Sequence, residues 1–149
     1  MQEPWSVFPA VLERYEDMLT FILGRARDCG VPEKRLLRMQ LGFEEAVVNI
    51  ISYAYDKAAP GKVWLRAWCE AGSFQLEMAD SGRPFNPLVM ADALEHPGAE
   101  PLEEKKIGCL GIAFIRRVFD EVSYSYEAQE EPVGNRLRLV IRLTPAVTP

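Results

Sequence analysis

Side chains that commonly bind metals or form covalent bonds are scarce in this sequence. Its 149 residues contain a single histidine, His96. One histidine argues against a histidine-based triad and a multi-histidine metal site, although it could still act alone as a base. The three cysteines, Cys29, Cys69 and Cys109, are far apart and form no CxxC pair. We therefore expect reduced thiols in a cytoplasmic protein, rather than disulfides or a zinc site.

Long apolar runs and clusters of basic residues are also missing. No apolar run approaches the roughly 20 residues that a membrane-spanning helix needs. Residues 1–5 lack the basic and apolar regions of a signal peptide, so we expect neither a secretion signal nor a membrane partner. The net charge is −5 and no Lys/Arg cluster is present, so direct nucleic-acid binding is not expected.

The sequence does contain enough apolar material for a core. Hydrophobic residues make up 48% and charged residues 26% of the chain, which is ordinary for a globular protein. A length of 149 residues is typical of one domain. We therefore expect a single domain over residues 1–149.

Two early segments have the apolar spacing of helices. The first runs from about Pro9 to Cys29, with Gly30 as its C-cap. The second runs from Pro32 to about Tyr55, and residues 5–8 before the first form a short edge strand. Gly42 inside the second helix costs about 1 kcal/mol relative to Ala. Close packing or a nearby ligand would explain it.

The apolar spacing then changes to two residues, which indicates strands. Residues 63–70 and 74–79 form a hairpin, and Glu121–Ala128 and Asn135–Leu143 form two later strands. Between these pairs lie a lid of about residues 87–107, with a possible short helix at 88–94, and a third helix that opens at Gly108. Residues 144–149 form a frayed tail. This order predicts an α+β two-layer sandwich, with helices on one face of a mixed, mainly antiparallel sheet.

Glu45 and Asn49 form an unusual polar pair in the second predicted helix. They lie four residues apart, one turn above the other, among apolar neighbours. One interpretation is that they lie on a solvated edge or contact each other. The other is that they face a bound ion and a reacting hydroxyl.

Two glycine motifs offer further candidate sites. Asp80-x-Gly82 follows a buried strand, where the aspartate could accept a hydrogen bond from a ligand amine and the glycine would allow close approach. Gly108-x-x-Gly111 opens the third helix, where free N–H groups can bind phosphate. Taken alone, each motif is more typical of an ordinary turn or helix start than of a binding site.

Together, in this order and spacing, the three motifs resemble the ATP-binding boxes of the GHKL group, which includes histidine kinases, gyrase-type enzymes, Hsp90 and MutL. Within it they are most similar to the anti-sigma-factor serine kinases of the RsbW and SpoIIAB type. The matching segments are E-A-V-V-N-I-I-S-Y-A-Y from Glu45, D-S-G-R-P-F-N-P from Asp80, and G-C-L-G-I from Gly108 to Ile112. Residues 119–122 and 134–137 also match, so the resemblance covers nearly the whole chain and implies the Bergerat fold.

The resemblance implies a role for each motif residue. Asn49 would hold Mg²⁺, and Glu45 would be the general base that takes a proton from the attacking hydroxyl. Asp80 would accept from the adenine amino group, with Gly82 allowing the base to approach. The residues that would bind the ATP phosphates under the lid are Gly108, Gly111 and Ile112.

The implied activity is an ATP-dependent serine/threonine kinase that acts as an anti-sigma factor. It would transfer the γ-phosphate to an anti-anti-sigma antagonist of the STAS type, bind a sigma factor, and form a homodimer. Tyr53, where the family often has histidine, and Cys109, which replaces a glycine, motivate an alternative. In that alternative the chain is an ATP-binding switch that sequesters a partner without kinase activity. The lone histidine argues against a histidine kinase.

Overall fold

A computed structural model describes residues 3–56, 58–88, 111 and 113–143. The order of elements is β1 (Ser6–Pro9), the 3₁₀ turn η1 (Leu12–Arg14), α1 (Tyr15–Asp28), α2 (Glu33–Asn49), the π-helix η2 (Ile50–Ala54), β2 (Lys62–Glu70), β3 (Ser73–Asp80), β4 (Glu121–Glu127) and β5 (Gly134–Arg142). Residues 111 and 113–118 are also helical. Most of the expected lid, residues 89–107, and the expected tail, 144–149, lie outside the described residues. No helix in the described part is long and apolar enough to cross a membrane.

The strands form one five-stranded sheet in the order β1-β2-β3-β5-β4. Every pairing between these strands is antiparallel. The β2–β3 hairpin has Leu65 opposite Met78, and β3 pairs with β5 so that Asp80 lies opposite Asn135. The predicted hairpin and the mainly antiparallel sheet are therefore confirmed, whereas the position of β4 at the edge is information that only the structure supplies.

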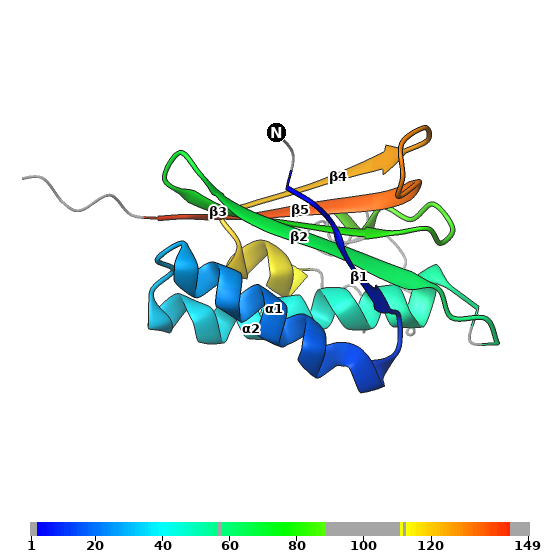
Figure 1. The fold of residues 1–149 in the computed structure, drawn as a ribbon, viewed down its shortest axis with the longest axis horizontal. Helices are drawn as coiled ribbons and strands as arrows, with labels where there is room; N and C mark the ends of the chain where they lie inside the picture. Colours follow the sequence, from blue (N-terminus) through cyan, green and yellow to red (C-terminus); the bar gives the residue numbers. More distant parts are fainter. Residues whose placement is uncertain (1–2, 57, 89–110, 112, 144–149) are drawn as a thin grey trace, which may run out of the picture.

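The helices cover one face of this sheet, as the prediction of a two-layer sandwich requires (Figure 1). The core lies between the layers. Met18 and Ile22 of α1, Phe43 and Val47 of α2, and Leu76 of β3 are each fully buried there. The apolar residues of α1 and α2 repeat every three or four positions, so each helix buries one stripe against the sheet. The first helix begins later than expected, because residues 12–14 form a 3₁₀ turn.

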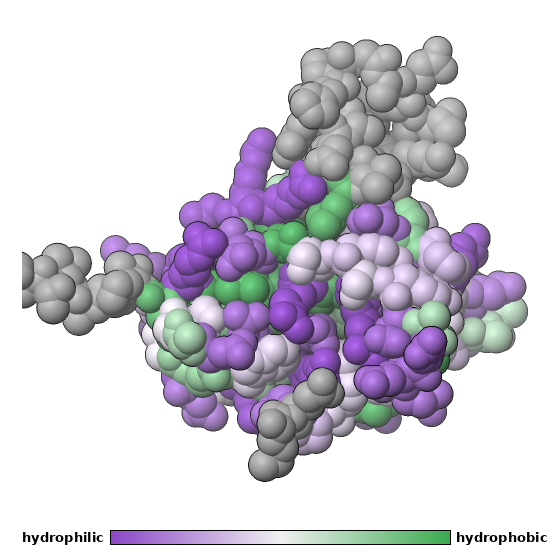
Figure 2. All heavy atoms as spheres, turned by 90° about the horizontal axis from the view of Figure 1, so that it is seen from above, coloured by the Kyte–Doolittle hydropathy of each residue, from purple (hydrophilic) through white to green (hydrophobic). Residues whose placement is uncertain are grey.

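The opposite face of the sheet carries charged and aromatic side chains. Figure 2 looks down on this face, where hydrophilic residues are prominent. Glu77 is buried and accepts hydrogen bonds from both Arg66 and Arg138. The guanidinium of Arg66 lies 4.0 Å from the ring centroid of Trp5, on the side of the sheet away from the helices. This arrangement pairs the buried Glu77 carboxylate with two cations.

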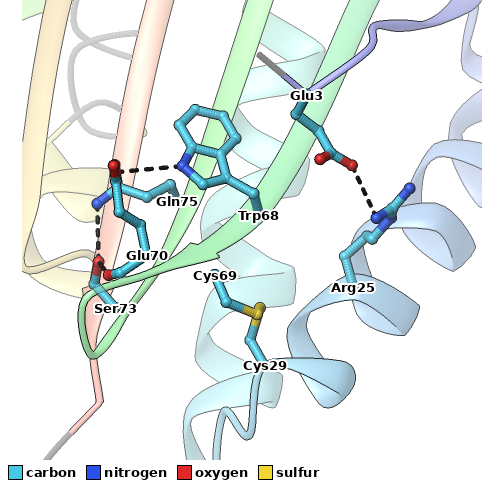
Figure 3. The surroundings of a disulfide bond; sticks show 8 residues. All are labelled: Glu3, Arg25, Cys29, Trp68, Cys69, Glu70, Ser73 and Gln75. Atoms are coloured by element: carbon cyan, nitrogen blue, oxygen red, sulfur yellow. Dashed lines mark hydrogen bonds and ion pairs between the residues drawn. A yellow bond between two sulfur atoms is a disulfide. The ribbon is translucent and has the colours of Figure 1, made fainter. Parts of the chain in front are cut away.

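The expectation that all cysteines are free thiols is wrong for two of them. A disulfide joins Cys29, at the end of α1, to Cys69, near the end of β2 (Figure 3). The two Cα atoms are 5.5 Å apart, which is an ordinary spacing for a disulfide. The residues are separated by 40 positions in the sequence. Only the packing of α1 under β2 brings them together, so cysteine spacing could not reveal the pair.

Candidate functional site

The site is built around the C-terminal end of α2. Regular α-helix ends at Asn49, and the next five residues, Ile50–Ala54, wind as a π-helix. A π-helix changes the direction of side chains relative to a continuous α-helix, and such segments are frequent at functional sites. The sequence predicted a single helix to about Tyr55. Its length is confirmed, but the change of winding at Asn49 carries no periodic signal in the sequence.

A cavity of about 580 Å³, open solvent at its mouth included, lies between this helix end and the ends of β3 and β5. Its walls are mostly apolar, with four polar side chains among them. Such a composition suits a ring system that is oriented by a few hydrogen bonds. The residues that line it are Ala46, Asn49, Ile50, Ala54, Met78, Asp80, Phe85, Pro87, Leu88, Ile115, Val122, Tyr124, Asn135 and Leu137.

Asn49 and Asp80, predicted from separate motifs, therefore line the same cavity. Asp80 is 6% exposed, and its Oδ1 atom accepts hydrogen bonds from the Gly82 N–H and from Asn135 Nδ2. Its other oxygen has no hydrogen-bond partner among the described residues. Burial raises the pKa of Asp80, while the hydrogen bonds from Asn135 and Gly82 lower it. One carboxylate oxygen is thus held by the protein, and the other is available as a hydrogen-bond acceptor.

Asn135 is a site residue that sequence reasoning missed. Besides Asp80, its Nδ2 atom donates to the Arg83 carbonyl at 2.8 Å. Its Oδ1 atom accepts from the Phe85 N–H at 3.0 Å and from the Tyr124 hydroxyl. A signal was present, because Asn135 occupies an inward position on a strand whose other inward residues are apolar. An amide at such a position requires polar partners.

Glu45 lies outside the cavity lining, one helical turn before Asn49. It is exposed, and its carboxylate lies against Gly111 at the third helix. A Cβ on Gly111 would overlap Glu45 Oε2. The structure therefore places Glu45 next to a residue of the third glycine motif, although the two are 66 positions apart in the sequence. The other members of that motif, Gly108 and Ile112, lie outside the described residues.

Gly82 has a structural requirement in addition to the expected one. A Cβ at this position would overlap the backbone of Ala54, at the end of the π-helix. The Arg83 N–H donates to the Ala54 carbonyl at 3.2 Å. The glycine thus allows the Asp80 loop to approach the π-helix closely, which brings Asn49 and Asp80 to one cavity.

Tyr55 holds the same loop from the other side. Its hydroxyl donates to the Lys62 carbonyl and accepts from the Ser81 N–H at 2.8 Å. Gly61 leaves room for the ring, because a Cβ there would overlap it. Nearby, the ring of Tyr53, where the resembled family often has histidine, is tilted by 27° relative to that of Phe85, with centroids 6.3 Å apart. These contacts fix the turn that follows Asp80.

The donor set fits a metal that is bound mainly through a ligand. The described residues contain no group of three or more His, Cys, Asp or Glu side chains that could hold a metal ion. Asn49 is a half-buried amide at the cavity wall. Mg²⁺ commonly takes one or two protein oxygens and completes its shell with phosphate and water. The residues present are therefore compatible with Mg²⁺ that arrives with a nucleotide.

The fold and cavity define a class of protein: an α+β domain with a mostly apolar cavity beside a helix end. Within that class, residues 8–141 match the family model of the histidine kinase-like ATPase domain. The chain therefore belongs to the histidine kinase-like ATPase family, and membership implies ATP binding.

Among solved structures, the chain is similar to that of the RsbU and RsbW domains of Rv1364c from Mycobacterium tuberculosis. The TM-score is 0.58 and the sequence identity is 16%. The match covers 97% of this chain and 35% of that one, so this chain spans about a third of the length of that protein. At this identity the likeness supports the fold. No curated protein matches this chain.

Proposed function

We propose that this protein is an ATP-dependent serine/threonine kinase that acts as an anti-sigma factor. Its substrate would be an anti-anti-sigma antagonist of the STAS type, and a sigma factor would be its second partner. The observation that carries the proposal is that described residues of all three motifs lie around the C-terminal end of α2. Asn49 and Asp80 line one cavity, and Glu45 lies beside Gly111 one helical turn away.

In this proposal, the cavity binds adenine and the end of α2 serves the phosphates. Asp80 accepts from the adenine amino group through its free oxygen, and the apolar walls exclude water from the ring. Gly108, Gly111 and Ile112 contact the phosphates. Asn49 would hold Mg²⁺, which neutralises the charge that develops on the transferring phosphoryl group.

Glu45 is suited to the acceptor side of the reaction. It is exposed and lies outside the cavity, so a hydroxyl of a protein substrate can reach it from solvent. Its carboxylate would accept the hydroxyl proton as the oxygen attacks the γ-phosphorus and the bond to ADP breaks. Asn49 and Glu45, one turn apart, would thus serve the nucleotide and the acceptor respectively.

Location and assembly belong to the same proposal. A sigma factor and its antagonist would place the protein in the cytoplasm, where we propose that it works as a homodimer. Disulfides are uncommon in that compartment, so the Cys29–Cys69 pair would be reduced for part of its lifetime there. Alkylation of free thiols in intact cells, followed by mass analysis, would measure that fraction.

Phosphoryl transfer from ATP to a purified cognate antagonist tests the kinase proposal. We expect Glu45→Ala to retain ATP binding and to lose about 10²- to 10⁴-fold in transfer rate, the usual contribution of a general base. Asn49→Ala should lose binding of Mg·ATP. Glu44→Ala is the matched control, because Glu44 is an exposed carboxylate on the same helix, about 100° around its axis from Glu45.

The alternative function is an ATP-binding switch that sequesters a partner without transfer. It would be favoured by tight ATP binding with no phosphorylated antagonist, in wild type and Glu45→Ala alike. Equal transfer rates for wild type and Glu45→Ala would instead remove Glu45 from the mechanism while leaving a kinase.

A further inference from the structure

We propose that Asn135, supported by Tyr124, is a positioning residue that sets the purine selectivity of the site by holding Asp80 as a hydrogen-bond acceptor. The inference rests on the proposed binding of adenine at Asp80. It adds residues that lie on strands β5 and β4, outside the three sequence motifs. The chemical group that these residues would select is the 6-amino group of a purine, in preference to a 6-carbonyl.

The orientation of the Asn135 amide is fixed by its neighbours. The Phe85 N–H can only donate, so Oδ1 must face it, and the Arg83 carbonyl can only accept, so Nδ2 must face it. In the opposite orientation, Oδ1 would face the Arg83 carbonyl, which is also an acceptor, and Nδ2 would face the Phe85 N–H, which is also a donor. The second hydrogen on Nδ2 is therefore directed at Asp80, and the distance from Nδ2 to Asp80 Oδ1 is 2.9 Å.

All four hydrogen-bonding positions of Asn135 are used within the protein. Two donors go to Asp80 and Arg83, and two acceptor positions take Phe85 and Tyr124. The side chain is only 6% exposed. A saturated amide has no free group for a ligand, so Asn135 acts through Asp80. It ties the aspartate on β3 to the turn at residues 83–85, which forms one wall of the cavity.

The consequence for Asp80 is a fixed division of its two oxygens. Oδ1 accepts from Asn135 and Gly82, and the other oxygen is left for the cavity. Both bonds favour the ionised form, which can only accept. An ionised Asp80 suits the N–H of a 6-amino group and opposes a 6-carbonyl. A protonated Asp80 could donate, and would then tolerate the carbonyl.

The protonation of Asp80 therefore bears on selectivity. Its pKa is raised by burial, and the Asn135 amide is the first of the two hydrogen bonds that oppose the rise. Removing that amide should raise the pKa further. Around Asp80, the facing residue on β4, Tyr124, can titrate, and its own pKa is raised by burial and by the Asp80 charge. Among the described residues, the strand partner of Asp80 and the rest of the cavity lining are uncharged, including Val63 on β2, Asn49 and Ala54 on the helix, and Asn135 on β5.

The test compares ATP with inosine triphosphate, in which a carbonyl replaces the 6-amino group and the triphosphate is unchanged. Dissociation constants of both nucleotides are measured from pH 5 to 8.5 for wild type, Asn135→Ala, Tyr124→Phe and Tyr126→Phe. Because the phosphates titrate alike, the ratio of the two constants reports on Asp80. Tyr126 is the matched control: it lies on β4 opposite Asn135 and is 46% exposed.

We expect Asn135→Ala to lower the preference for ATP at pH 7.5 by about 10- to 100-fold, the effect of losing a hydrogen bond to a charged group. The pH at which the preference is half lost should move upward. Tyr124→Phe removes one of the two hydrogen bonds that Asn135 Oδ1 accepts, so it should lower the preference for ATP about 2- to 5-fold. Tyr126→Phe should leave it unchanged. Tyr124→Phe keeps the test decisive if Asn135→Ala does not fold.

Two results would overturn the inference. If both variants lose thermal stability but keep the wild-type ratio and its pH profile, Asn135 only supports the fold, while the proposed function stands. If the wild-type protein binds neither nucleotide, the proposed ATP site fails and the inference fails with it.

Discussion

At the scale of single residues, Tyr15 is a half-buried side chain whose hydroxyl is buried without a hydrogen-bond partner among the described residues. Its ring stacks on Phe43, with centroids 6.1 Å apart. Burial, together with the charge of Glu44, raises the pKa of Tyr15 to about 12. The hydroxyl has therefore lost water without gaining a protein partner.

We predict that Tyr15→Phe stabilises the protein. The substitution keeps the stacked ring and removes the unpaired hydroxyl, whose desolvation costs about 1–3 kcal/mol. Chemical denaturation at pH 7.5 should show a free energy of unfolding higher by about 1 kcal/mol. Tyr53→Phe, at an exposed ring, serves as the control and should change little. A loss of stability in Tyr15→Phe would mean that an ordered water satisfies the hydroxyl.

Asp80 is a residue whose ionised form lowers the stability of the fold. Its pKa is raised by burial, so its protonated form contributes stability that is fully present below its ordinary value of 3.8. That stability is lost as the pH rises through the raised pKa. At neutral pH the ionised carboxylate therefore destabilises the fold, and we infer that it is retained for ligand binding.

We predict that Asp80→Asn raises the melting temperature at pH 7.5 and abolishes nucleotide binding. The advantage of the variant should shrink as the pH falls toward 3.8, where the wild-type carboxyl is also neutral. Melting curves from pH 3.5 to 8 measure this. Asp28→Asn, at an exposed carboxylate on α1 away from the cavity, is the control. An advantage that stays constant with pH would show that charge is not its cause.

At the scale of elements, the sequence predicted most of the secondary structure because apolar periodicity is local information. It correctly predicted α2 and the four longer strands to within a few residues, and it predicted α1 with a start six residues too early. It did not predict the π-helix after Asn49, because residues 50–54 are compatible with both an α-helix and a π-helix. The inward Asn135 on β5 was also missed, because its partners come from three other segments.

Gly42 shows how the structure decides between two interpretations of one residue. The sequence left open whether close packing or a ligand explains this helical glycine. A Cβ built there would lie 3.2 Å from Phe119 Cε2 and 3.3 Å from Val118 Cβ. The glycine therefore allows α2 to cross close to the helix at residues 113–118. The Glu45 carboxylate lies against Gly111, just before these residues.

We predict opposite outcomes for two helical glycines. Gly24 on α1 has nothing within 4 Å of an added Cβ, so Gly24→Ala should stabilise by about 0.5–1 kcal/mol through helix propensity. Gly42→Ala should gain less, and Gly42→Val should lose about 1–3 kcal/mol through overpacking. Urea denaturation of the three variants measures this. Stabilisation by Gly42→Ala equal to that at Gly24 would show that the helix crossing is loose.

At the scale of the whole molecule, the disulfide is the feature that composition predicted least well. An odd number of widely spaced cysteines argued for free thiols, yet Cys29 and Cys69 are joined. The bond links the end of α1 to the end of β2, and so connects the helical layer to the sheet (Figure 3). It lies at the end of β2 away from Asp80, which pairs with Val63 at the other end of that strand.

We predict that reduction lowers stability without changing the nucleotide site. Closing a loop between residues 40 positions apart restricts the unfolded chain by about 4 kcal/mol in the loop-entropy treatment. A reductant should therefore lower the melting temperature, and Cys69→Ser should reproduce the loss and no longer respond to reductant. Cys109→Ser keeps the pair and is the control. Because the bond is remote from Asp80, ATP affinity below the melting range should be the same in both redox states. A change in affinity on reduction would show that the two layers must be linked for the cavity to keep its shape.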